Sequence, residues 1–159
     1  MTAPTMASKF VYVTYIRTTQ EKLWRALREP EFTRQYFFGA TQECDWKVGS
    51  PWKMIRSTGE VTDSGRVVEF DPYNRYVLEW GNEFMPELKA EGYGRMTCTL
   101  EPFGDVVKLT ILHEMPVPDS KTVAAVSGGW PKILASLKSL LETGTAMPDL
   151  KAATAAKPG

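Results

Sequence analysis

The middle of the chain follows a period of two, and a single long helical pattern comes after it. Large apolar residues alternate with polar ones, as in strands that bury one face. The segments are Trp52–Arg56, Val67–Phe70, Tyr76–Trp80, Met96–Leu100 and Leu109–His113. From about Ser120 to Glu142 the apolar residues recur at helical spacing instead. Because a sheet with one long element to cover it must curl around that element, we expect an α+β fold with a curved antiparallel sheet and a C-terminal helix.

Shorter elements precede this region. Residues 9–16 are dense in β-branched and aromatic residues and predict a first strand. Gln20–Arg28 carries one apolar stripe and predicts an amphipathic helix, which Pro30 ends. A second short helix is expected from about Glu31 to Tyr36. Two short helices should therefore lie between the first strand and the rest of the sheet.

The second half of the chain contains clear signals for turns and helix ends. Asp71-Pro72-Tyr73-Asn74 has the residues of a tight turn and predicts a hairpin over residues 65–81. Pro131 lies inside the long helical pattern and predicts a kink or a break there. Gly144 predicts the end of that helix. We expect one domain over residues 1–159, with its core at about 9–144 and a C-terminal extension at 145–159.

Composition excludes several classes of protein. Hydrophobic residues make up 43% and charged residues 24%, so the chain should fold. Lys+Arg and Asp+Glu both number 19, which leaves no basic field for nucleic acid. The first ten residues do not resemble a signal peptide and no run is long enough to span a membrane, so we expect a cytoplasmic protein. Cys44 and Cys98 are then expected as free thiols.

The inner face of the predicted sheet carries unusually large side chains. Trp52, Met54, Trp80, Met96 and Trp130 could line an apolar pocket that binds a small molecule. The alternative is that these side chains simply fill the core. Both interpretations stay open at this stage.

Few residues offer chemistry. His113 is the only histidine and should point inward, as a possible acid, base or donor or as an ordinary core residue. With one histidine and no ligand spacing at the cysteines, we predict no metal site and no cofactor. In a hairpin register that places Val68 and Phe70 across from Leu78 and Tyr76, Arg66 shares the inner face with Trp80. It would then reach the pocket mouth or pair with an acid.

The same register assigns two carboxylates to the opposite face. Glu69 and Glu79 should lie on the solvated outer surface of the sheet, which favours a surface role over an acid/base pair. Catalysis therefore has little support from the residues alone.

Three segments resemble the SRPBCC (START-like, Bet v-like) superfamily, and most closely its Aha-like branch, named for homology to the activator of the ninety-kilodalton heat-shock-protein ATPase. They are GRVVEFDPYNRYVLEW at 65–80, LTILHE at 109–114 and SGGWPKILASLKSLLETG at 127–144. The resemblance implies a helix-grip fold with seven strands and a cavity between helix and sheet. One departure is Tyr73, where this branch usually has proline.

The resemblance also implies a set of ligand-binding residues. Those expected to line the cavity are Trp52, Met54, Trp80, Met96, Cys98, Leu109, Ile111, His113, Trp130 and Leu134, with Tyr36 and Phe37 near its entrance. Arg66 joins them as a polar candidate from the hairpin register. Together with His113 it is the candidate catalytic pair.

The superfamily includes lipid and sterol carriers, antibiotic-resistance proteins, polyketide cyclases and co-chaperone domains, so the fold alone does not choose a function. Our leading hypothesis is a non-enzymatic protein that binds a small hydrophobic molecule, such as a lipid, a polyketide or an aromatic metabolite. The second is a cyclase or hydrolase in which His113 and Arg66 polarise a carbonyl. The third is a module that contacts a chaperone or another protein through the outer face of the sheet; a homodimer is compatible with all three.

Overall fold

The structure, a computed structural model, describes residues 5–148, which form seven strands and four helices. In chain order these are β1 Ser8–Ile16, α1 Gln20–Arg28, α2 Pro30–Tyr36, β2 Thr41–Cys44, β3 Pro51–Ile55, β4 Val61–Asp71, β5 Arg75–Asn82, α3 Pro86–Lys89, β6 Gly94–Phe103, β7 Val106–Met115 and α4 Lys121–Thr143. The predicted α+β order, with two short helices after the first strand and one long helix last, is confirmed.

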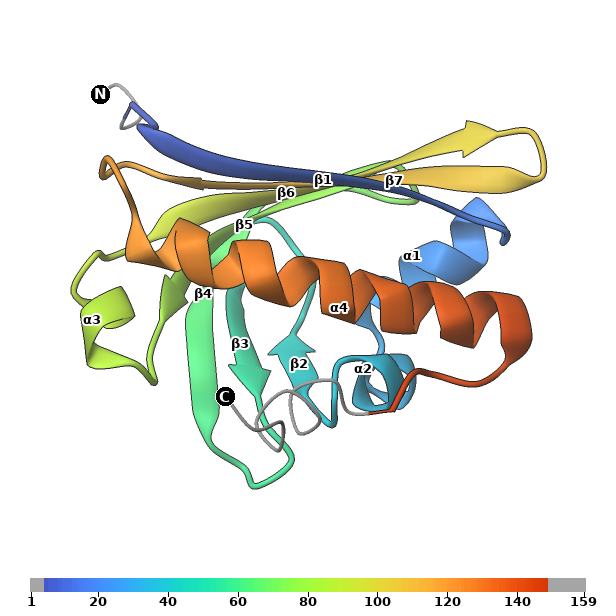
Figure 1. Ribbon diagram of the computed structural model, residues 1–159, viewed down its shortest axis with the longest axis horizontal. Helices are drawn as coiled ribbons and strands as arrows, with labels where there is room; N and C mark the ends of the chain where they lie inside the picture. Colours follow the sequence, from blue (N-terminus) through green and yellow to red (C-terminus); the bar gives the residue numbers. More distant parts are fainter. Residues whose placement is uncertain (1–4, 149–159) are drawn as a thin grey trace, which may run out of the picture.

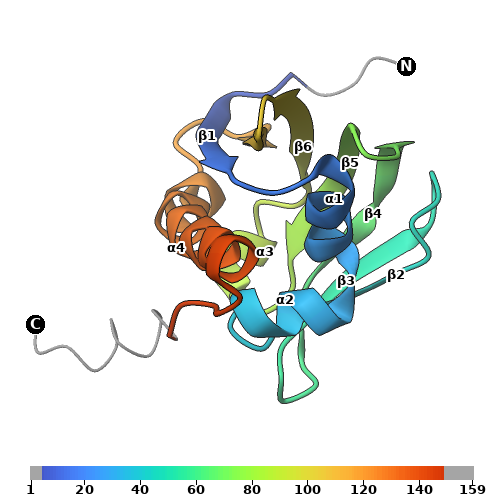
Figure 2. The same ribbon diagram turned by 90° about the vertical axis from the view of Figure 1, so that its right-hand side faces the viewer.

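All seven strands belong to one antiparallel sheet, in the order β1-β7-β6-β5-β4-β3-β2. The sheet curls, and α4 runs across its concave face (Figure 1). The view along α4 shows the sheet wrapped around that helix, with α1 and α2 closing the remaining side (Figure 2). This is the helix-grip arrangement that the sequence predicted.

The helix ends follow from local chemistry. Thr19 Oγ1 accepts a hydrogen bond from the Lys22 amide at 3.1 Å and caps α1. Ser120 caps α4 in the same way, and Gly144, at φ 86°, ends it in the left-handed conformation. Between these caps α4 continues through Pro131 as one helix, so the break allowed by the sequence is not found.

The inward positions of β6 and β7 are as predicted. Met96, Cys98 and Leu100 on β6 are buried, and so are the inward residues of β7 from Val107 to Met115. Cys98 and the half-buried Cys44 are both free thiols. The alternation in these two strands therefore identified their core face correctly.

The predicted register of the β4–β5 hairpin is wrong at one point. Val67 lies across from Leu78, but Phe70 lies across from Tyr76, so β4 contains an extra residue between them. Such a bulge reverses the inside-outside alternation on one side of it. Arg66 consequently points outward, with its side chain 62% exposed, instead of sharing the inner face with Trp80.

Arg66 ends a row of alternating charges on the convex face. Cross-strand partners run Lys9–Glu114, Glu114–Arg95, Arg95–Glu79 and Glu79–Arg66. The last pair is an ion pair with Nη2 and Oε2 3.7 Å apart. We call these five residues the charge row. Of the two alternatives that the sequence left open for Arg66, pairing with an acid is therefore the one found, but on the outer face of the sheet.

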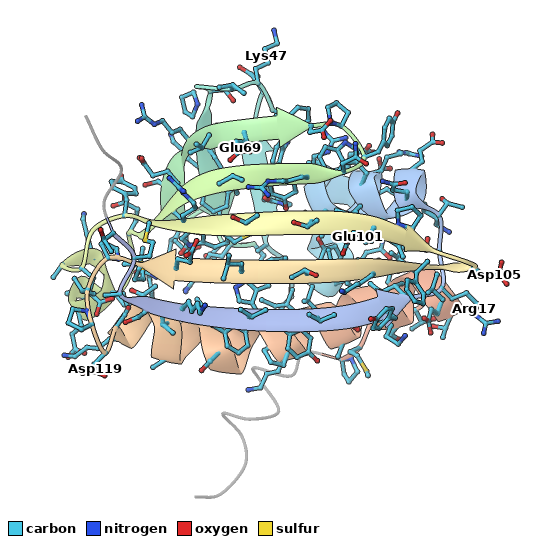
Figure 3. All side chains as sticks on the ribbon, turned by 90° about the horizontal axis from the view of Figure 1, so that it is seen from above. Arg17, Lys47, Glu69, Glu101, Asp105 and Asp119 are labelled. Carbon is cyan, nitrogen blue, oxygen red and sulfur yellow. The ribbon has the colours of Figure 1, made fainter. Side chains whose placement is uncertain are left out.

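The convex face is the side of the sheet turned away from α4, and Figure 3 looks onto it, with Glu69 and Glu101 labelled there. Glu69 and Glu79 both lie on this face, as predicted.

The predicted Asp71–Asn74 turn is present, and one of its residues has a positive φ. The Asn74 amide donates to Asp71 O at 3.0 Å, and Asn74 Nδ2 donates to Asp71 Oδ2 at 3.2 Å. Tyr73 has φ 71°, a value that the ring of proline forbids. The departure from the proline usual in the Aha-like branch therefore accompanies a turn that proline could not make.

Candidate functional site

Side chains fill the space between α4 and the sheet. What is left is a cavity of about 10 Å³, which has room for no more than about one water molecule. Its walls come from α1, α2, β2, β3, β5, β6, β7 and α4. They consist of Leu27, Tyr36, Phe37, Gln42, Met54, Tyr76, Trp80, Met96, Ile111, Trp130, Ile133 and Leu134. Of the two interpretations left open by the sequence, the described residues show the filled core at this position, and a ligand-sized internal pocket is not confirmed.

Three tryptophans form the centre of this filling. The rings of Trp52 and Trp80 have centroids 4.4 Å apart, and Trp80 meets Trp130 edge-on at 5.9 Å. The indole N–H of Trp52 donates to Gln42 Oε1 at 2.9 Å, and that of Trp80 donates to Asp63 Oδ2 at 2.8 Å. Because a buried indole N–H without a partner is costly, these hydrogen bonds fix the orientation of both rings.

His113 is the hydrogen-bond partner of the third tryptophan, Trp130. Its Nδ1 accepts the Trp130 Nε1–H at 3.2 Å, so the ring proton belongs on Nε2. That nitrogen is buried and has no hydrogen-bond partner within residues 5–148. Burial lowers the pKa of His113 to about 4, so the ring is neutral near pH 7. His113 stands behind Trp80 and Trp130 and does not form part of the cavity wall.

An open groove adjoins the filled cavity. Its volume is about 500 Å³, within the range of small-molecule sites. Phe37, Met54 and Trp80 line both the groove and the cavity. The other residues of the groove wall are Phe38, Ala40, Arg56, Ser57, Thr58, Thr62, Asp63, Asn82, Phe84 and Met85. The groove is therefore the solvent side of the core that the sequence predicted as the site.

Two segments with particular backbone geometry form the rim of the groove. Phe38 has φ 53°, an uncommon conformation for a bulky residue that proteins retain mostly where it has a use. On the other side, Asn82 Oδ1 accepts hydrogen bonds from the amides of Phe84 at 3.0 Å and Met85 at 2.7 Å. These bonds hold the loop so that two half-exposed apolar side chains face the groove.

Arg56 links the two sides. It follows β3, and its guanidinium lies 4.1 Å from the ring centroid of Phe84, the geometry of a cation–π contact. Its Nη1 is 3.6 Å from Glu60 Oε2. A cation therefore stands at the mouth of a groove whose wall combines aromatic, aliphatic and polar side chains.

A profile of the family described as "Activator of Hsp90 ATPase homolog 1-like protein" matches residues 17–142. The chain belongs to this family. Curated protein sequences gave no match.

Several solved structures have a similar fold. Protein MLL2253 from Mesorhizobium loti has a TM-score of 0.73 at 23% identity, over 85% of this chain and 97% of that one. The Aha1 dimer from Colwellia psychrerythraea has a TM-score of 0.68 at 19% identity, over 86% and 98%. DynU16, from the dynemicin biosynthetic locus, has a TM-score of 0.71 at 18% identity, over 87% of this chain and 48% of that chain. At these identities the likeness concerns the fold.

In this member of the Activator of Hsp90 ATPase homolog 1-like family, the predicted site residues separate into three groups. Those that line the cavity are Tyr36, Phe37, Met54, Trp80, Met96, Ile111, Trp130 and Leu134. Those that are buried but lie off its wall are Trp52, Cys98, Leu109 and His113. Arg66 is outside on the charge row. Tyr36, predicted near the entrance, is buried, whereas Phe37 reaches the groove.

The predicted catalytic pair is not brought together. His113 is in the core and Arg66 is on the convex face, so they cannot polarise one carbonyl. Within residues 5–148 there is no cluster of three or more His, Cys, Asp or Glu side chains that could hold a metal ion. In that same part of the chain, the helices are too short or too polar to cross a membrane.

Proposed function

We propose that this protein binds a small hydrophobic molecule in the groove beside the filled core, without catalysing a reaction on it. The observation that carries the proposal is the continuity between the two spaces. Phe37, Met54 and Trp80 have one side in the core and another in the groove. A ligand there would contact apolar side chains that the fold already holds in place, which lowers the ordering cost of binding.

The site offers little for catalysis. His113 has the chemistry of an acid or base, but it lies behind the tryptophans, away from the cavity wall. The groove wall has apolar side chains, hydroxyls and one carboxylate, that of Asp63, whose Oδ2 already accepts the Trp80 indole N–H at 2.8 Å. Such a surface can bind and orient a molecule, whereas acid–base catalysis needs a group within hydrogen-bond reach of the reacting atom.

The experiment is native mass spectrometry of the purified protein, paired with a thermal-shift screen of fatty acids, sterols, flavonoids and polyketides. A bound or stabilising compound is expected. Ala40→Phe, which places a large ring into the groove, should abolish the shift. Ala124→Phe adds the same ring at an exposed position of α4 and should leave the shift unchanged.

The two variants separate specific from unspecific binding. If Ala40→Phe and Ala124→Phe respond to the panel as the parent protein does, the ligand does not occupy the groove. If the parent protein carries no compound and is stabilised by none, the binding function itself is wrong.

A second candidate, a protein-interaction module, is supported by one observation. The edge strand β1 exposes Val11, Val13 and Tyr15 on the convex face, each 42–50% exposed, and an open sheet edge can pair with another chain. Stimulation of a ninety-kilodalton heat-shock-protein ATPase that survives Ala40→Phe but is lost in Val11→Lys would favour it. Light scattering on the parent protein and on Val11→Lys tests whether this surface mediates self-association. The charge row makes the convex face beside these residues polar, which weighs against a protein interface there and favours ligand binding in the groove as the function.

A further inference from the structure

We infer that the ligand of the groove is a flat aromatic molecule with one anionic group, such as a carboxylate, and that Arg56 recognises this group. The inference rests on the proposed function, because it concerns the same groove. It names the chemical class of the ligand and a residue that determines specificity.

The first step is the availability of Arg56. It is the one cationic side chain among the described residues of the groove wall. Within residues 5–148 its guanidinium makes a single ion pair, to Glu60 at 3.6 Å, and no hydrogen bond. That separation is long for a hydrogen bond. The planar guanidinium therefore has donors left for a bidentate contact with an anion.

The second step is the position of Arg56 relative to the acid of the groove. Asp63 lies within β4, opposite Met54 and Asn82, and its Oδ2 accepts the Trp80 indole N–H at 2.8 Å. A second negative charge near the floor would be repelled by this carboxylate. Arg56 lies beyond the end of β3, at the rim. The two charges thus orient an anionic ligand with its charge outward and its apolar body toward Trp80.

The third step is the aromatic wall. Phe37, Phe38, Phe84 and Trp80 all line the groove, with Phe84 half-exposed and Trp80 buried. Aromatic side chains favour flat partners that stack or meet them edge-on. Because the Arg56 guanidinium already lies over Phe84, a ligand anion would meet a cation that this stacking holds in place.

A pair of fluorescent probes tests the inference. Anilinonaphthalene sulfonate is a flat aromatic anion, and N-phenylnaphthylamine is the same ring system without the sulfonate. Both are titrated into the parent protein, Arg56→Gln and Arg66→Gln. Arg66→Gln removes the same charge from the convex face, at a position outside the groove wall. Thermal unfolding of each variant verifies that it is folded at the assay temperature.

The parent protein should bind the sulfonate on the order of tenfold more tightly than the neutral probe, as one charge-assisted contact at an exposed site allows. Arg56→Gln should remove this preference and leave the affinity for N-phenylnaphthylamine within about twofold. Arg66→Gln should change neither affinity.

Each other result has a definite meaning. Equal affinity for both probes, or a sulfonate preference that survives Arg56→Gln, overturns the anion site and leaves the proposed function standing. Equal losses in Arg56→Gln and Arg66→Gln reduce the effect to net charge and also overturn it. If neither probe binds the parent protein, the anion site is overturned, whereas the proposed function is decided by the native mass spectrometry and the thermal-shift screen.

Discussion

Removing the carboxylate of Glu91 should loosen the N-terminal end of α4, although Glu91 is 29 residues from Ser120 in the chain. Its Oε2 accepts the Lys121 amide at 2.7 Å, and its Oε1 accepts the Thr122 amide at 3.1 Å and the Ser120 hydroxyl at 2.6 Å. The first amides of a helix have no partner within the helix. Glu91 supplies one, with the charge that the helix dipole favours.

The pKa of Glu91 sets the size of the effect. Burial favours the neutral acid, but the hydrogen bonds from Ser120, Thr122 and Lys121 outweigh it and lower the pKa from 4.5 to about 2. A change of this size corresponds to about 3 kcal/mol. Because the side chain is partly exposed, solvent screening reduces the expected contribution to about 1–2 kcal/mol at neutral pH.

The sign of the pH dependence follows. A carboxylate with a lowered pKa stabilises the folded state fully above its unfolded-state pKa of 4.5, and the contribution is lost as the pH falls toward about 2. Urea unfolding should therefore show Glu91→Gln to be less stable than the parent protein by about 1–2 kcal/mol at pH 7. The gap should shrink to less than half by about pH 3, because most of the linked stabilisation is then gone.

Glu87→Gln provides the matched control. Glu87 lies in α3 and is exposed, and among the described residues its side chain makes one ion pair, to Lys121 at 3.6 Å. Its replacement should change stability by no more than a few tenths of a kcal/mol. If Glu91→Gln costs no more than Glu87→Gln at pH 7, or if its cost is the same at both pH values, the capping argument is refuted.

Three further predictions concern the core and the glycines. His113 should stay neutral, with its proton on Nε2, down to pH 5 in ring-nitrogen NMR spectra, because burial lowers its pKa to about 4; titration near 6.5 would contradict this. Gly128→Ala should stabilise the protein by about 0.5–1 kcal/mol in urea unfolding, since its Cβ would meet open space within a helix. Gly65→Ala should destabilise it severely in that assay, because its Cβ would lie 1.7 Å from Glu79 O.

The fold was predictable because several local signals agree with one another. The helix Gln20–Arg28 has the predicted limits, the long helix begins within one residue of the predicted start at Ser120, and Gly144 ends it as predicted. Alternation failed only where β4 contains an extra residue, and that one residue moved Arg66 from the inner face to the outer. A bulge has no strong sequence signal, so this error could not have been avoided from periodicity.

The site was less predictable than the fold. The residues that face the core could be named, but whether they enclose a cavity or fill it depends on how closely the side chains pack. Most of the groove rim was missed because Phe38, Phe84 and Met85 lie in loops. Arg56 carried a usable signal, since it continues the alternation of Trp52 and Met54 on β3.

The charge row limits how the strands can be mispaired. A slip of one residue between neighbouring strands exchanges the buried and exposed faces, so burial alone opposes it. A slip of two residues keeps every apolar side chain inside, and burial then cannot distinguish it from the native pairing. Such a slip between β6 and β7 would place Arg95 opposite Leu112 or Pro116 in place of Glu114. The charges on the convex face therefore help to select the native strand register, because they disfavour the two-residue slip that burial of apolar side chains does not disfavour.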